Sequence, residues 1–387
     1  MMKELLFVCY GLGIGGIEKC LVNLINALPE DKFNIDLLLM NPEYDLKDQI
    51  KRSVNLIDRY YYVMNTTDTM NEISEHGGIL RNFGTFIRYC CYRLSVKINL
   101  KPWKWFKQVL KEYDVAIAYS QNDYSPYYVI DRVKANKKVM WYHNGAYERA
   151  GKIYELDKQY YNRFDNIVAV STDCSKVLKK HFPDSEERVI VLRNICDIES
   201  IKSKSEEFFP DSFRSEGMHI TSVGRLTPEK GPDLAVKACS ILVSHGINIY
   251  WHWIGDGNQK DVISKSIDDN HLNQRFILEG NQNNPYPFIK YCDIYVQPSY
   301  YEAYSTTVTE AKVLKKPIVT TDVGGMRDQI MDGLSGLIVP INSDEIAAAI
   351  IKFLENEELR KNCSIALETN PISNNEALKD YFHLFCG

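Results

Sequence analysis

Hydrophobic positions along the 387-residue chain form short apolar runs that alternate with segments of helical periodicity. This alternation predicts an α/β fold in which helices cover both faces of parallel sheets. In the first half, the predicted strands cover residues 5–10, 35–40, 115–119, 138–142, 167–170 and 189–192. In the second half, they cover residues 219–223, 250–254, 276–278, 294–296, 318–321 and 336–339. The length allows two domains of ordinary size, each with its own core.

A hydrophilic stretch separates the two halves. Residues 199–217 are rich in Glu, Lys, Ser and Asp and contain few apolar side chains. We therefore predict an N-terminal domain over residues 1–200, a linker over 201–217, a second domain over 218–370, and a C-terminal helix within 371–387.

Composition narrows the class of protein. The net charge of -5 argues against a general nucleic-acid binder, which carries a basic excess. No apolar run is long enough for a transmembrane helix, and the N-terminus has no signal-peptide pattern. The ten cysteines are scattered without a C-x-x-C pair, so we expect reduced thiols and a cytosolic protein.

Two carboxylates stand eight positions apart where an apolar strand leads into a helix: Glu302 and Glu310. Ligands of open α/β sheets bind at the carboxyl ends of strands, where helix N–H groups favour a diphosphate. A carboxylate beside such a site suits sugar hydroxyls. The alternative is a helix-capping box from Thr307 to Glu310, in which Glu310 serves only the backbone.

A glycine-rich turn, residues 11–16, follows the first strand and contains G-x-G-x-x-G. One interpretation is a dinucleotide site, whose acidic residue should end the second strand; Glu43 fits that position only loosely. Another is a tight strand-to-helix turn with no ligand.

A second turn, residues 222–231, places Arg225 and Lys230 after a strand of the second half. Fixed cations stabilise the charge that develops on a leaving diphosphate. The alternative is a pair of solvated cations in which Lys230 pairs with Glu229. The chain has no Asp-x-Asp pair that would bind a divalent ion at a diphosphate, so we predict no metal and no cofactor.

In this order, the motifs resemble those of the retaining nucleotide-sugar glycosyltransferases of group 1, family 4, whose Glu-x7-Glu pair matches Glu302 and Glu310. The resemblance implies a GT-B fold: two Rossmann-like, doubly wound domains that face each other across a cleft. It implies an N-terminal acceptor-binding domain, a C-terminal domain for the nucleotide-sugar donor, and a last helix that crosses back. The expected reaction moves a sugar, most commonly from UDP, to a glycan or polyprenyl-linked acceptor in bacterial surface polysaccharide synthesis.

The resemblance also implies residue roles. The catalytic group is His143, Arg225, Lys230 and Glu302, with His143 at the end of the strand over 138–142. The donor-binding group is Gly15, Gly16, Gly224, Gly255, Leu278, Tyr304, Ser305, Thr306 and Glu310. An isolated His at a strand end can instead be structural. Ala303 and Ser305 stand where the family has glycines, which leaves the donor sugar open.

Residues 81–111 carry eight basic side chains and no acidic one, interleaved with Phe, Tyr and Trp. Basic groups are attracted to anionic lipids and aromatic rings favour the headgroup boundary, so this segment suits peripheral contact with the inner face of a membrane. The alternative is a solvated helix pair whose aromatic rings pack on the sheet.

Two other functions remain open at this point. A nucleotide-sugar epimerase shares the two-domain architecture and would convert the donor without an acceptor. A non-catalytic sugar-nucleotide-binding partner of another transferase would not need to keep Arg225, Lys230, Glu302 and Glu310 together.

Overall fold

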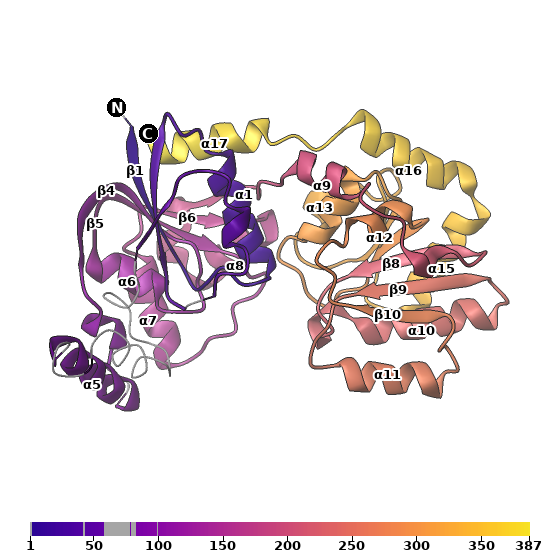
Figure 1. Ribbon diagram of the computed structural model, residues 1–387, viewed down its shortest axis with the longest axis horizontal. Coiled ribbons are helices and arrows are strands. Elements are labelled where there is room, and N and C mark those ends of the chain that lie inside the picture. Colours follow the sequence, from indigo (N-terminus) through magenta and orange to yellow (C-terminus); the bar gives the residue numbers. More distant parts are fainter. Residues whose placement is uncertain (1, 42, 58–77, 79–82, 99) are drawn as a thin grey trace. The chain divides into compact units, whose positions relative to one another are not determined.

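The computed structural model describes residues 2–41, 43–57, 78, 83–98 and 100–387. The chain forms two compact α/β units, each built on one parallel sheet (Figure 1). The first unit comprises Met1–Ile195 and Asn374–Gly387, and the second comprises Cys196–Ser373. The predicted fold class is confirmed.

The sheet of the first unit has the strand order β3-β2-β1-β4-β5-β6-β7. Its strands are β1 Lys3–Cys9, β2 Phe33–Leu39, β3 Asn55–Ile57, β4 Val109–Ala118, β5 Val133–Tyr142, β6 Asn166–Ala169 and β7 Val189–Val191. The sequence analysis missed β3, a three-residue edge strand with little apolar signal. It also began β4 and β5 too late, because their first halves carry exposed polar side chains.

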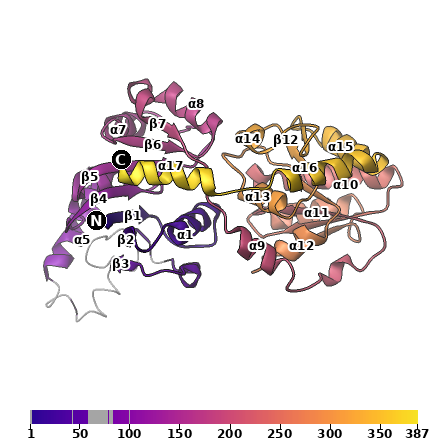
Figure 2. The same cartoon turned by 90° about the horizontal axis from the view of Figure 1, so that it is seen from above.

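Helices flank this sheet (Figure 2). They are α1 Gly16–Ala27, α5 Phe83–Lys97, α6 Ser125–Arg132, α7 Lys152–Tyr161, α8 Thr172–His181 and α17 Asn375–Cys386. The last of these, α17, buries Tyr381 against Trp141 of β5 with ring centroids 6.0 Å apart. Lys137 donates to the carbonyl of Leu384 at 2.9 Å. The end of the described chain is therefore part of the first unit.

The sheet of the second unit has the order β10-β9-β8-β11-β12-β13. Its strands are β8 Met218–Val223, β9 Ile249–Ile254, β10 Phe276–Gly280, β11 Ile294–Gln297, β12 Ile318–Thr321 and β13 Leu337–Val339. Its helices are α9 Ile198–Lys204, α10 Pro232–Ser244, α11 Lys260–Asp269, α12 Tyr286–Tyr291, α13 Thr306–Val313, α14 Met326–Gln329, α15 Ser343–Glu355 and α16 Glu357–Thr369.

Side chains of alternate strand residues form a core on each face of this second sheet. Val319 of β12 packs in the core that α10 and α15 cover, while its neighbour Ile318 packs in the core beneath α12 and α13. This alternation is the period-two geometry of a strand buried on both faces.

The segment predicted as a linker, residues 201–217, belongs to the second unit. Ile201 of α9 and Phe213 are buried in its core, and Phe213 lies edge-on to Phe288. The few apolar side chains in this hydrophilic stretch are thus the ones that anchor it. The boundary of the first unit lies at Ile195 rather than at residue 200.

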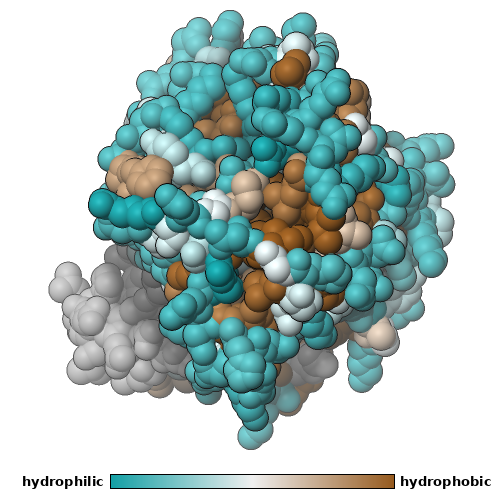
Figure 3. Space-filling model, turned by 90° about the vertical axis from the view of Figure 1, so that its right-hand side faces the viewer, coloured by the Kyte–Doolittle hydropathy of each residue, from teal (hydrophilic) through white to brown (hydrophobic). Residues whose placement is uncertain are grey.

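The surface of the second unit seen in Figure 3 is mainly hydrophilic, with apolar residues gathered near its middle. All ten cysteines are free and most are buried, as expected for reduced core thiols. Among the described residues, no helix combines the length and the apolar character needed to cross a bilayer.

Candidate functional site

Both sheets reverse their strand order at one place, and the predicted site residues follow the strands at these places. In the second unit, β8 and β11 are neighbours although they are not consecutive, and Lys230 and Glu302 lie in the loops that follow them. In the first unit, the reversal lies between β1 and β4. Such switch points are where open α/β sheets bind ligands.

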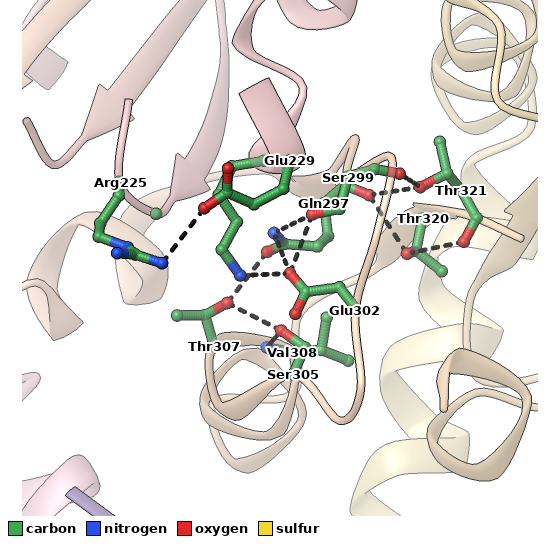
Figure 4. A network of polar contacts seen from close by, with 12 residues as sticks. Arg225, Glu229, Gln297, Ser299, Glu302, Ser305, Thr307, Val308, Thr320 and Thr321 are labelled. Atoms are coloured by element: carbon green, nitrogen blue, oxygen red, sulfur yellow. Dashed lines mark hydrogen bonds and ion pairs between the residues drawn. The ribbon is translucent and has the colours of Figure 1, made fainter. Parts of the chain in front are cut away.

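Glu302, labelled in Figure 4, forms an ion pair with Lys230 in the second unit. The Nζ of Lys230 lies 2.7 Å from Oε1 of Glu302, and the two side chains are 22% and 7% exposed. The same Oε1 accepts from Ser299 Oγ at 2.9 Å and from Gln297 Nε2 at 3.3 Å. Both residues were predicted from the sequence as site residues. Their pairing, across 72 positions of the chain, was not predicted.

Gly231 explains how this pair forms. It has a φ of 66°, and a Cβ at this position would lie 1.9 Å from the carbonyl oxygen of Pro298. A side chain would therefore separate the turn after β8 from the loop after β11. Gly224 lies on the other side, where a Cβ would lie 3.5 Å from the side chain of Lys230. A Cβ at position 224 would make only an ordinary van der Waals contact, so it is Gly231 that allows Lys230 to reach Glu302.

Arg225 has a different environment. Its side chain is 70% exposed and pairs with Glu229 at 3.2 Å. The alternative interpretation, in which Lys230 pairs with Glu229, is wrong: Arg225 makes that contact, while Lys230 turns to Glu302. Arg225 is therefore exposed to an approaching ligand, whereas Lys230 is already ordered.

The helix α13 begins beside Glu302. Its N-cap is Ser305, whose Oγ accepts from the N–H of Val308 at 3.2 Å. Glu310 is buried, 3% exposed, in the helix interior five residues beyond the cap. The capping-box alternative for Glu310 is therefore wrong, because Ser305 and Val308 form the cap.

Gln329 of α14 holds the backbone of Ser305 on both sides. Its Oε1 accepts from the Ser305 N–H at 2.9 Å, and its Nε2 donates to the Ser305 carbonyl at 2.8 Å. The Ser305 N–H is thus already paired inside the protein and is not a free donor to phosphate. The predicted neighbours Tyr304 and Thr306 flank it in the loop and in the first turn of α13.

The remaining donor-side residues lie at the ends of β9 and β10. Gly255 has a φ of 133°, and a Cβ there would lie 2.1 Å from the carbonyl oxygen of Gly224. Its N–H donates to the carbonyl of Gly280 at 2.8 Å, beyond the half-buried Leu278. The packing of two turns is thus a reason for glycine at position 255 that needs no ligand.

His143 of the first unit directly follows β5 and is 9% exposed. Its Nε2 lies 3.0 Å from the carbonyl of Tyr119, so Nε2 carries the proton and Nδ1 is the acceptor. Burial lowers the pKa of His143 to about 4. The imidazole is therefore neutral at pH 7. Gly15 is the N-cap of α1 and Gly16 is its first residue.

Sequence reasoning missed Gln121, which follows β4 as His143 follows β5. Ala118 pairs with Met140, so Gln121 stands level with His143 when the register is continued. Its side chain is 2% exposed, and neither polar atom has a hydrogen bond within the described structure. The backbone carbonyl of Gln121 accepts a hydrogen bond from the guanidinium of Arg149 at 3.1 Å. Arg149 is in turn paired with the buried Asp157. A polar residue at this strand end was the available signal.

Among the described residues, no cluster of three or more His, Cys, Asp or Glu side chains has the arrangement of a metal site. The cations at the predicted site are instead Lys230 and Arg225.

The two parallel sheets, each with one switch point, are those of a GT-B fold. The model of the family "Glycosyltransferase Family 4" matches residues 14–200, and that of "Glycosyl transferases group 1" matches residues 203–368. Together the two models cover most of the chain. The chain therefore belongs to the group 1, family 4 glycosyltransferases.

Three similar proteins illustrate the relationship. An uncharacterized glycosyltransferase of Methanocaldococcus jannaschii is 25% identical over 268 residues, 60% of this chain and 65% of that protein. The N-acetylgalactosamine-N,N'-diacetylbacillosaminyl-diphospho-undecaprenol 4-alpha-N-acetylgalactosaminyltransferase of Campylobacter jejuni is 28% identical over 203 residues, 52% of this chain and 54% of that protein. The crystal structure of Anabaena HepE with UDP and glucose has a TM-score of 0.74 at 16% identity, over 100% of both chains. The matches thus span less than two thirds of the length of these curated relatives.

Proposed function

We propose that this chain is a retaining glycosyltransferase that moves a sugar from a nucleoside diphosphate to a hydroxyl of a glycan or lipid-linked acceptor. The observation that carries the proposal is the Lys230–Glu302 pair at the switch point between β8 and β11. A cation there can stabilise the leaving diphosphate, and a carboxylate beside it can bind the hydroxyls of the transferred sugar. Glu310, buried in α13, is assigned to the ribose.

The comparisons support the donor and acceptor classes. HepE has been crystallised with UDP and glucose, and the Campylobacter jejuni relative is named for a diphospho-undecaprenol-linked acceptor. We therefore assign UDP as the nucleotide and a polyprenyl-linked glycan of bacterial surface polysaccharide synthesis as the acceptor. The identity of the transferred sugar is left to experiment, since Ala303 and Ser305 replace the family's glycines.

The proposed reaction needs no metal, because Lys230 and Arg225 supply fixed positive charge for the diphosphate. Retention is assigned to a same-face route in which the leaving phosphate draws the proton of the acceptor hydroxyl.

On the acceptor side, we assign hydroxyl recognition to the first unit. The neutral His143 offers Nδ1 as an acceptor, because Nε2 is held by the carbonyl of Tyr119. The amide of Gln121 offers both a donor and an acceptor, and burial without a partner carries a free-energy cost that a ligand would offset.

A thermal-shift comparison with UDP, GDP, dTDP and NAD, each with EDTA, tests the function. A nucleotide at about 100 times its Kd stabilises the fold by roughly 2.7 kcal/mol. We expect UDP to raise the Tm despite chelation. Stabilisation by NAD alone would instead favour a dinucleotide site in residues 11–16, and a nucleotide response that needs a divalent ion would overturn the metal-free proposal.

The products of the reaction separate the other functions. Release of UDP together with a glycosylated acceptor is expected of the transferase. An isomerised donor in a reaction without acceptor would establish an epimerase, while tight UDP binding without any turnover would favour a non-catalytic partner.

We further propose that α5 and the loop after it contact an anionic membrane. Four aromatic rings of the segment pack inside the first unit, as the alternative interpretation expects: Tyr89, Tyr92, Trp103 and Phe106. Other apolar side chains of α5 and of the loop up to residue 108 are 43–60% exposed: Phe83, Ile87, Leu94, Val96, Ile98, Leu100 and Trp105. The exposed basic side chains of α5 and of the loop up to residue 108 are Arg93, Lys97, Lys104 and Lys107. Arg81 lies outside the described residues.

The substitution Leu94→Asp tests this contact. Leu94 is 58% exposed, so the fold should tolerate the change, while an apolar anchor is lost and a negative charge is added. We expect at least a 10-fold weaker partition onto vesicles that contain anionic lipid, measured by flotation. The control is Val262→Asp in α11, since Val262 is 59% exposed on the second unit. Equal loss in both variants would argue against a specific role of α5.

A further inference from the structure

Gln297, the last residue of β11, has its side-chain amide between two sets of partners (Figure 4). Its Oε1 accepts from the Tyr295 hydroxyl at 2.7 Å and from Thr307 Oγ1 at 3.0 Å. Its Nε2 donates to Ser299 Oγ at 2.9 Å and to Glu302 Oε1 at 3.3 Å. The side chain is only 2% exposed, so this amide makes its contacts away from bulk water.

The chemistry of the partners fixes which way the amide is turned. A carboxylate only accepts hydrogen bonds, so the group that faces Glu302 must be the NH2 of Gln297. Its carbonyl oxygen then faces Thr307, which must donate its only hydroxyl proton to it. The orientation of Gln297 is thus dictated by Glu302.

The same reasoning orders the bonds that lead back into α13. Thr307 has used its proton on Gln297, so the 3.1 Å contact between the hydroxyls of Ser305 and Thr307 requires Ser305 to donate. Ser305 Oγ in turn accepts from the N–H of Val308. The result is one chain of hydrogen bonds, each pointing the same way, from the first turn of α13 to Oε1 of Glu302. Bonds arranged head to tail polarise one another.

Within the described structure, the recorded bonds to the Glu302 carboxylate all end on Oε1: those from Lys230, Ser299 and Gln297. Oε2 is the oxygen that these contacts leave for a ligand. The orientation of the carboxylate is therefore set by its surroundings before any sugar arrives, which is the preorganisation that binding sites require.

We propose that Gln297 is a positioning residue that holds Glu302 for the transferred sugar and couples it, through Thr307 and Ser305, to the first turn of α13. This inference rests on the proposed function, because it takes Glu302 as the sugar ligand and the start of α13 as the neighbour of the diphosphate. Gln297 does not touch the donor itself. Through Gln297, the orientation of Glu302, and with it the recognition of the sugar, depends on the first turn of α13.

The test compares binding of UDP with that of UDP-glucose and UDP-N-acetylglucosamine, using whichever sugar nucleotide the wild type binds more tightly. Thr307→Val removes the donor to Gln297 and leaves the amide and Glu302 in place. We expect at least a 10-fold loss of the preference for the sugar nucleotide over UDP, while the Kd for UDP changes less than threefold. Thr307→Ser keeps the hydroxyl and should restore the preference.

Gln297→Glu supplies an independent readout. The new carboxyl lies where an amide NH2 faced Oε1 of Glu302 at 3.3 Å. Two carboxylates at this distance share a proton at low pH, and the shared proton replaces the lost donor. The sugar preference of this variant should therefore recover as the pH falls and disappear as the pH rises. The wild type has an amide at this position and should show no such recovery.

Thr369→Val is the matched control, since Thr369 also uses its hydroxyl within a helix, bonding the Ile365 carbonyl at 3.0 Å in α16. A sugar preference unchanged in Thr307→Val would overturn the inference, as would an equal loss in Thr369→Val. If Gln297→Glu does not fold, the two Thr307 variants decide the matter. A wild type that binds neither UDP nor a UDP-sugar would instead overturn the proposed function.

Discussion

Replacing Lys230 by methionine is expected to lower kcat by about 10²- to 10³-fold, the range found when a preorganised group that stabilises transition-state charge is removed. Methionine keeps most of the volume of the lysine stem and removes only the charge. The Nζ of Lys230 lies 2.7 Å from Glu302 and is held by the turn after β8, so it can act on a leaving diphosphate without reorganising. The measurement is release of UDP from the sugar nucleotide that the wild type uses.

Loss of Lys230 should also destabilise the fold by about 1 to 3 kcal/mol, because the carboxylate of Glu302 remains buried without its cation. The double variant Lys230→Met with Glu302→Gln removes that unpaired charge. We expect it to regain stability, which would show that the destabilisation of Lys230→Met comes from the unpaired carboxylate. Thermal melts of both variants measure this difference.

The matched control is Lys237→Met in α10. Lys237 pairs with Asp233 at 3.2 Å, but its side chain is 59% exposed, and such surface pairs contribute little. A kcat that falls equally in both variants, or that stays at the wild-type level in Lys230→Met, would remove Lys230 from the mechanism.

The difference between Lys230 and Arg225 shows how far the sequence could go. Both cations were predicted from one turn, and motif order alone could not tell them apart. The distinction arises from Gly231, whose close approach to the Pro298 carbonyl brings Lys230 to Glu302. Such a contact joins loops that are far apart in the sequence, so no local pattern records it.

The strands were predictable where both faces are buried, and hard to predict elsewhere. The apolar parts of β11 and β12, residues 294–296 and 318–319, were predictable because each of these side chains enters a core. β3 and the first halves of β4 and β5 carry exposed residues, which weakens the apolar signal. The linker prediction failed for a related reason: two buried side chains, Ile201 and Phe213, outweigh the polar composition around them.

Gln297 was overlooked for the opposite reason. It ends an apolar strand, and a single polar residue at that place looks like the start of a loop. Its importance depends on four partners: one in its own strand, two in the loop after β11 and one in α13, which only the folded chain brings together. Sequence reasoning found the groups expected to touch the donor, but not the residue that orients one of them.

Replacing Glu310 by alanine is expected to weaken UDP binding by about 10- to 100-fold. Hydrogen bonds to a charged group contribute about 1.5 to 3 kcal/mol, and the ribose hydroxyls would lose such bonds. Glu310 is 3% exposed in α13, and the helix is capped by Ser305 without its help. Isothermal titration with UDP measures the change.

A nucleotide without ribose hydroxyls makes this test specific. If Glu310 binds the ribose, the wild type should bind 2′,3′-dideoxy-UDP about as weakly as Glu310→Ala binds UDP, and the variant should not distinguish the two nucleotides. Glu355→Ala, at an exposed position of α15, is the control. An equal loss of affinity for both nucleotides in Glu310→Ala would mean that Glu310 supports the fold of α13 instead. The discrimination between the two nucleotides, rather than the affinity alone, therefore decides whether the second carboxylate of the pair touches the donor.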